Sequence, residues 1–151
     1  MIKKLAGSFL AAGAVLVFAA PAAEAAPAEP FTINESFSDV PGENRFAATE
    51  PLCLSGTFVD IPQVGGGSEV ASRFNLVVNT VYTCDDGGRT FVAHKHWHIV
   101  FSNGGFTNTG QIRFDGGTGA FTQLSGHGTI NSESLDGNTG KALISGVLKL
   151  S

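Results

Sequence analysis

The chain has 151 residues and a net charge of −4, with 13 acidic and nine basic residues and no basic stripe. Because nucleic-acid affinity depends on lysines and arginines that neutralise phosphates, this composition excludes nucleic acid as an expected partner. The length favours a single globular domain.

Residues 1–25 have the pattern of a secretory signal peptide. Two lysines precede an uncharged apolar run over residues 5–20, and alanines at 23 and 25 fit the small-x-small pattern of a cleavage site. A membrane anchor needs about 20 apolar residues, so this run is too short, and no later stretch is apolar enough. We therefore expect a secreted, extracellular protein without membrane contact after cleavage. Its mature chain would have a disordered N-terminus over 26–30 and one domain over 31–151.

Strand patterns begin after the proline at position 30. The segments "FTINESF" (31–37) and "LCLSGTFVDI" (52–61) alternate apolar and polar residues, and 45–49 reads as a further short strand. The glycine-rich segment "QVGGGSEV" (63–70) is expected to be a flexible loop.

Cys53 and Cys84 are the two cysteines of the chain. In an oxidising compartment, an even pair of cysteines is expected to form a disulfide. A metal site or a redox pair would usually show C-x-x-C spacing, which these residues lack. We therefore predict a structural disulfide between them.

The clearest strand is "RFNLVVNTVYTC" at 73–84, in which an apolar face alternates with a polar one. The turn "DDGG" (85–88) follows, so the next strand, from about 89 to 101, is expected to run antiparallel.

That next strand contains "AHKHWHIV", with His94, His96 and His98 at alternate positions. Side chains two residues apart on a strand point the same way, about 7 Å apart. Neutral imidazoles suit divalent zinc, copper or nickel, and His127 could supply a further ligand if the register brings it near. The opposite face is apolar except for Lys95. If the apolar face points inward, the histidines are solvated or line a subunit contact; if the lumen is a polar pocket, they line a ligand site.

Glycine-rich turns divide the rest of the chain. "SNGG" (102–105) separates the strand at 89–101 from one over 106–114, "DGGTG" (115–119) separates that strand from one at 120–131, and a last strand covers 141–150. Seven or eight short strands with such turns predict an all-β fold, an antiparallel closed barrel of about eight strands, with a β-sandwich as the alternative.

The run "FDGGTGAFTQLSGHGTI" (114–130) resembles a Gly-Gly-Thr-Gly-x-Phe/Tyr segment of the allene oxide cyclase and dirigent-like barrel proteins, especially their small secreted bacterial relatives of unassigned function. In those relatives a cysteine near the first strands, a "DGxGTFT" strand and a "GTGxYAGLxGxG" strand occur in this order. This chain offers Cys53, "DDGGRTFVAHKHWH" and "GGTGAFTQLSGHG". The resemblance implies an eight-stranded barrel with a cavity, often dimeric or trimeric. No functional residue is carried over, because the shared motif is a turn and a strand.

We therefore expect non-covalent binding of a small, largely apolar molecule in the barrel, without a cofactor, and we favour binding over catalysis. One alternative is a cyclase or isomerase with a histidine or tyrosine as acid or base. The other is extracellular capture of a divalent metal by His94, His96 and His98. The expected core or cavity walls are Phe74, Leu76, Tyr82, Phe106, Ile112, Phe114 and Leu148.

Overall fold

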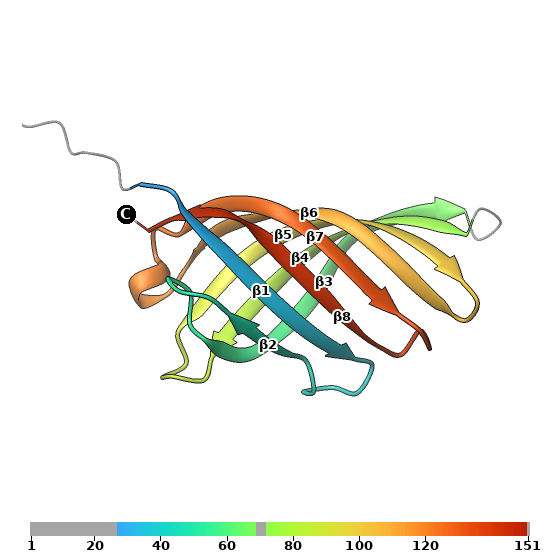
Figure 1. Cartoon of the computed structure of the whole chain (residues 1–151), viewed down its shortest axis with the longest axis horizontal. Helices are drawn as coiled ribbons and strands as arrows, with labels where there is room; N and C mark the ends of the chain where they lie inside the picture. The colour runs from blue at the N-terminus through green and yellow to red at the C-terminus, as the bar shows by residue number, and fades with distance from the viewer. Residues whose placement is uncertain (1–26, 69–71, 151) are drawn as a thin grey trace, which may run out of the picture.

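The computed structural model describes residues 27–68 and 72–150 and forms a closed barrel of eight antiparallel strands (Figure 1). Each strand pairs with its neighbours in the chain, and the last strand returns to pair with the first. The predicted closed barrel is confirmed, and the β-sandwich alternative is wrong. The elements are β1 (Glu29–Ser38), β2 (Arg45–Ala48), β3 (Ser55–Ser68), β4 (Arg73–Cys84), β5 (Thr90–Ser102), β6 (Gly105–Gly117), the 3-10 turn η2 (Gly119–Phe121), β7 (Ser125–Ser134) and β8 (Thr139–Lys149).

Side chains on each strand alternate between the lumen and the solvent, as the period of two requires. In β8, Ala142, Ile144 and Leu148 are buried, whereas Leu143 and Val147 lie exposed on the outer face. This alternation is why a sequence without helical periodicity forms one continuous sheet around a core.

The N-terminal boundaries differ from those predicted. The predicted signal peptide, residues 1–25, lies outside the described residues. The prediction of a disordered segment over 26–30 is wrong for Glu29 and Pro30, because both residues pair with β8. These pairs belong to the β1–β8 ladder that closes the barrel, so the closed sheet has no free edge there.

The flexible loop expected at 63–70 is wrong over residues 63–68, which continue β3 and pair with β4. Gly65 explains how this glycine-rich stretch enters a strand. A Cβ on Gly65 would come 2.7 Å from Cζ of Phe74, so the Phe74 ring packs directly over the backbone of this glycine. Residues 69–71 lie outside the described part of the chain.

The strand expected over 120–131 begins later, at Ser125. Gly119–Phe121 form η2 instead. Phe121 and Leu124 are both buried, and their spacing of three residues belongs to a helical turn rather than to a strand. No helix in ranges 27–68 and 72–150 is long and apolar enough to cross a membrane.

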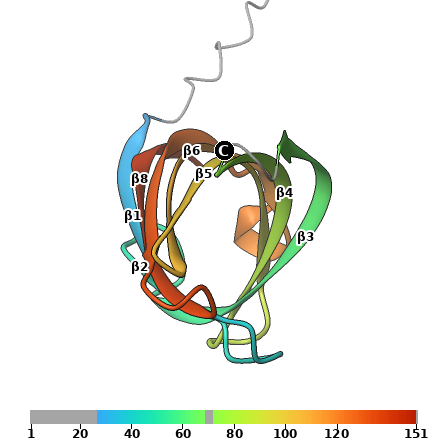
Figure 2. The same cartoon turned by 90° about the vertical axis from the view of Figure 1, so that its right-hand side faces the viewer.

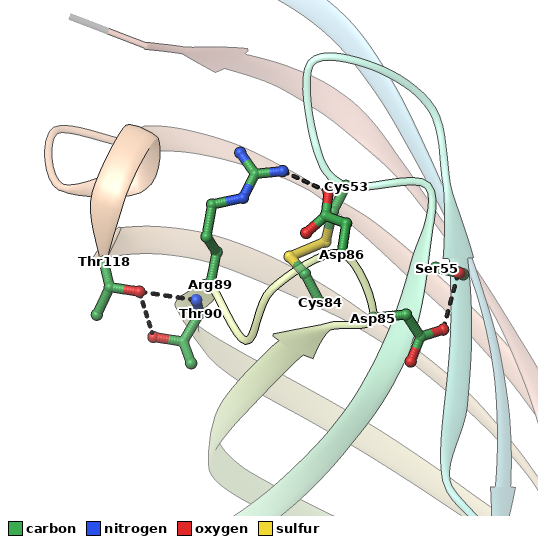
Figure 3. Close-up of a disulfide and its surroundings, with 8 residues drawn as sticks. All are labelled: Cys53, Ser55, Cys84, Asp85, Asp86, Arg89, Thr90 and Thr118. Carbon is green, nitrogen blue, oxygen red and sulfur yellow. Dashed lines mark hydrogen bonds and ion pairs between the residues drawn. A yellow bond between two sulfur atoms is a disulfide. The ribbon is translucent and has the colours of Figure 1, made fainter.

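Cys53 and Cys84 form the predicted disulfide, with their Cα atoms 5.9 Å apart (Figure 3). The bridge joins the loop before β3 to the end of β4. Two hydrogen bonds connect loops and strands at the same end of the barrel (Figure 3). Ser55 Oγ donates to Asp85 Oδ2 at 2.9 Å, and the backbone N–H of Thr90 donates to Oγ1 of Thr118 at 2.8 Å. The loops here are thus fastened to the strands beneath them.

Aromatic side chains fill the half of the lumen near the disulfide. The Phe91 ring stacks on Tyr82 at a centroid distance of 4.5 Å and meets Phe46, Phe114 and Phe121 edge-on at 5.7, 6.0 and 5.4 Å. Figure 2 looks into the barrel from the opposite end, with η2 visible through the ring of strands. The half of the lumen near the disulfide is therefore a packed core, and any ligand space inside the lumen lies towards the opposite end.

Candidate functional site

The end of the lumen opposite the disulfide contains a cavity of about 250 Å³. Its apolar wall includes Phe37, Phe106, Ile130 and Ala142. The rings of Phe37 and Phe106 stack with their centroids 5.9 Å apart. Sites for drug-sized ligands usually occupy about 300–1,000 Å³, so this cavity suits a smaller molecule.

Lys95, which interrupts the apolar face of β5, lies fully inside the barrel. Its Nζ donates to Oε1 of Glu35 at 2.7 Å and lies 3.5 Å from Oδ1 of Asp60. Moving an unpaired ammonium out of water costs several kcal/mol, so the two carboxylates explain how a lysine is accommodated here.

Three aromatic rings complete the surroundings of this ammonium. Nζ of Lys95 lies 5.1, 5.3 and 5.6 Å from the ring centroids of Phe58, Tyr82 and Trp97. A cation within about 6 Å of a ring is attracted by the negative face of the ring. The lysine is thus enclosed by aromatic side chains and held by carboxylates at the inner end of the cavity.

Both carboxylates have further hydrogen bonds on the oxygens that meet Lys95. Tyr82 Oη donates to Oε1 of Glu35 at 2.5 Å, and Thr80 Oγ1 donates to Oδ1 of Asp60 at 2.5 Å. In the described residues, no side chain donates to Oε2 of Glu35 or to Oδ2 of Asp60. Since Glu35 and Asp60 both line the cavity, each leaves one oxygen for a ligand or for water.

Burial raises the pKa of the Tyr82 phenol well above its usual value, and the negative charge of Glu35 and the hydrogen bond to it raise it further. The phenol therefore stays neutral at physiological pH and acts as a hydrogen-bond donor. It holds Glu35 in place.

Two buried polar atoms at the cavity have no hydrogen-bond partner in the described chain, Trp97 Nε1 and Asn108 Oδ1. The Asn108 amide is oriented by its own Nδ2, which donates to Ser132 Oγ at 3.0 Å. Because more than nine in ten buried polar groups in native proteins are hydrogen-bonded, an unpartnered donor and an unpartnered acceptor in one cavity point to a bound molecule or water.

The predicted ligand-binding histidines lie on the outer face of β5. The face opposite to them points into the lumen, so the interpretation in which they line the lumen is wrong. His94 Nδ1 lies 2.5 Å from Oδ1 of Asn79, and its Nε2 lies 3.0 Å from Oδ2 of Asp115. His98 Nδ1 lies 2.8 Å from Oδ1 of a neighbouring asparagine, and His96 is exposed. Ligand binding by these three side chains stays a prediction.

His127 lies two strands away from His94, because Arg113 of β6 is opposite both residues. A cationic side chain therefore stands between the two imidazoles. Among residues 27–68 and 72–150, no group of three or more His, Cys, Asp or Glu side chains is placed to hold a metal ion. Metal capture on this face has no preformed geometry in the described chain and stays a prediction.

The sequence reasoning missed Glu35 and Asp60. Each follows the inward pattern of its strand: Glu35 lies between the inward residues Ile33 and Phe37, and Asp60 comes two residues after Phe58. The signal that identifies both residues in the sequence is a charged residue on the apolar face of a strand. From the sequence, we apply this signal to Lys95 alone.

The cavity can bind a small molecule by a polar group at its inner end and by apolar contacts along its walls. Of the residues expected to form the core or cavity walls, Phe106 lines this cavity. The residues Tyr82, Ile112, Phe114 and Leu148 belong to the core, whereas Phe74 and Leu76 are half-buried.

Comparisons with models of protein families, with curated proteins and with solved structures found no match to this chain.

Proposed function

We propose that the protein is exported and binds a small, largely apolar molecule non-covalently inside its barrel. The observation that carries the proposal is the cavity of about 250 Å³, which has apolar walls and the unpartnered polar atoms of Trp97 and Asn108. A cavity that combines apolar walls with convergent polar groups is typical of small-molecule sites. The disulfide supports an oxidising compartment.

The groups inside the lumen favour binding over catalysis. An acid or base must reach the proton that it transfers. Tyr82 already donates to Glu35, and Lys95 donates to the same oxygen. Both side chains therefore hold the inner end of the cavity in place, whereas the histidines expected to act as acid or base lie outside.

Trp97 is the one tryptophan of the chain, and it lines the cavity, so its fluorescence reports occupancy directly. The test titrates the purified, disulfide-bonded protein with neutral probes that have an apolar body and one hydroxyl group, 2-phenylethanol and cyclohexylmethanol. We expect a saturable change in Trp97 fluorescence.

Two variants on the same strand separate the lumen from the outer face. Ala142→Phe fills the cavity and is expected to abolish the saturable change, whereas Ser145→Phe adds the same ring outside and is expected to keep it. Because overpacking costs about 1–3 kcal/mol, the thermal midpoint of each variant is measured first. If Ala142→Phe does not fold, Ser132→Leu takes its place. A wild-type protein that shows no saturable change with these alcohols or with an amine of the same size, or equal responses of the two phenylalanine variants, would overturn the proposal.

A further inference from the structure

We infer that the head group of the ligand is a protonated amine, so that the cavity takes a small organic cation with an apolar body. This inference rests on the proposed function and specifies its ligand. Its first basis is charge. Glu35, Asp39 and Asp60 line the cavity, and in the described chain no lysine or arginine does so.

Lys95 cancels only one of these negative charges. Its side chain is 0% exposed, and its ammonium is bound to Glu35 on the core side of the cavity. One ammonium stands against the two carboxylates Glu35 and Asp60, and Asp39 adds a third at the mouth. In a narrow cleft with low-dielectric walls, such a surplus attracts a positive ligand more strongly than it would in open solvent.

The second basis is the set of acceptors that have no hydrogen-bond donor, of which Asn108 Oδ1 is independent of the charge. Asn108 is 3% exposed, and its Oδ1 lacks a partner in the described residues. The second oxygens of Glu35 and Asp60 receive no hydrogen bond from that part of the chain. An alkylammonium group has three N–H donors and no acceptor, which matches in number the three acceptors that these residues bring to the cavity lining.

An amine leaves the Trp97 N–H to water, but it matches the charge of the site better than the other head groups do. An alcohol satisfies Asn108 Oδ1 and the Trp97 N–H but leaves the negative charge uncompensated. A carboxylate satisfies only the Trp97 N–H and meets like charges, which is unfavourable in a partly desolvated site. The expected order of affinity is amine, then alcohol, then carboxylate.

The experiment compares three probes with the same phenyl body in the wild-type protein at neutral pH: phenethylamine, 2-phenylethanol and phenylacetate. Each is titrated against Trp97 fluorescence and checked by calorimetry. Hydrogen bonds to charged partners are stronger than neutral ones, so we expect the amine to bind about tenfold more tightly than the alcohol, which corresponds to about 1.4 kcal/mol. Phenylacetate should bind most weakly.

Asp60→Asn tests the source of the preference. The amide keeps an oxygen for Thr80 and Lys95 but removes one charge, so the affinity for the amine should fall about tenfold while that for the alcohol stays the same. Asp115→Asn makes the same change on the outer face and should leave all three affinities unchanged.

The outcomes separate the two proposals. Equal affinities for amine and alcohol, or tightest binding of phenylacetate, would overturn the amine inference while the cavity function stands. An amine preference that Asp115→Asn reduces and Asp60→Asn does not would place the cation outside the lumen and also overturn it. No saturable binding of any probe would remove the proposed function itself. Because the probe comparison uses the wild-type protein, it does not depend on the stability of a variant.

Discussion

Nζ of Lys95 and Oε1 of Glu35 lie 2.7 Å apart inside the barrel although the two residues are 60 positions apart in the chain. They come from β5 and β1, which are separated by three strands on either side of the ring. The ion pair therefore spans the lumen. It divides the packed aromatic half of the barrel from the half that holds the cavity.

Lys95→Met should lower the free energy of unfolding by about 3–5 kcal/mol, because it leaves the Glu35 carboxylate buried without its cation. Removing both charges, in Glu35→Gln with Lys95→Met, should restore most of the loss. Urea unfolding measures the free energy of unfolding of the wild type, of Lys95→Met and of the double variant. Arg45→Met, which breaks an exposed ion pair with Asp85, is the control and should cost less than about 1 kcal/mol. A Lys95→Met protein as stable as the wild type would show that the buried pair has no such role.

Tyr82 is the one tyrosine of the chain, so a spectroscopic titration reports this residue alone. Its pKa is raised well above 10.0 by burial and by Glu35, so the native protein should show no tyrosinate absorbance at pH 10. Because the folded state keeps the phenol protonated at a pH where the unfolded chain loses that proton, burial of Tyr82 links the free energy of unfolding to pH. Its contribution is fully present below the ordinary pKa of tyrosine and is lost as the pH rises from that value through the raised pKa of the folded state.

Tyr82→Phe provides the control for that titration. It removes the ionisable group and the hydrogen bond to Glu35, so it should be less stable at neutral pH but should lose stability less steeply above pH 10. Tyrosinate absorbance in the folded wild-type protein at pH 10 would contradict the burial argument.

The strand pattern could be predicted from the sequence because alternation is a local property. The stretch 73–84 and the turns at 85–88 and 102–105 follow the period of two and the conformational freedom of glycine, and the structure has them there. The strand start at 120 failed because Phe121 is buried through a helical turn, which alternation alone does not distinguish.

The site depends on the register around the whole barrel. Neighbouring strands are fixed by their turns, but the meeting of Lys95, Glu35 and Asp60 requires closure between β1 and β8 and the stagger of the strands. A single sequence does not contain that information. The regular spacing of His94, His96 and His98 is a local pattern and therefore predicts a site from the sequence, whereas single charges on the inward faces of separate strands do not.

The disulfide should contribute about 3–4 kcal/mol to the free energy of unfolding, because Cys53 and Cys84 close a loop with a sequence separation of 31. The double variant Cys53→Ser with Cys84→Ser should lose this amount in urea unfolding. Reducing the wild-type protein should produce the same loss, and the double variant should not respond to the reductant. A double variant as stable as the oxidised protein would contradict this expectation.

Asp136 organises the β7–β8 hairpin at the mouth of the cavity. Its Oδ1 accepts the backbone N–H groups of Asn138 and Thr139 at 2.9 and 2.8 Å, and its Oδ2 accepts the Thr139 hydroxyl at 2.9 Å. The backbone hydrogen bond from Thr139, followed by that from Asn138, lowers the pKa of Asp136 from 3.8 to about 2. The charged form therefore holds the turn.

A lowered pKa in the folded state stabilises the protein above the ordinary pKa, and this contribution disappears as the pH falls through the lowered value. Asp136→Asn should therefore reduce the thermal midpoint at neutral pH, and its difference from wild type should shrink between pH 3.8 and about 2. Glu29→Gln, an exposed change of equal charge, is the control for net charge. Because Gly137 and Asn138 line the cavity, Asp136→Asn should also weaken the binding of the neutral probes. A difference in thermal midpoint that does not change with pH would show that the turn does not depend on the charge of Asp136.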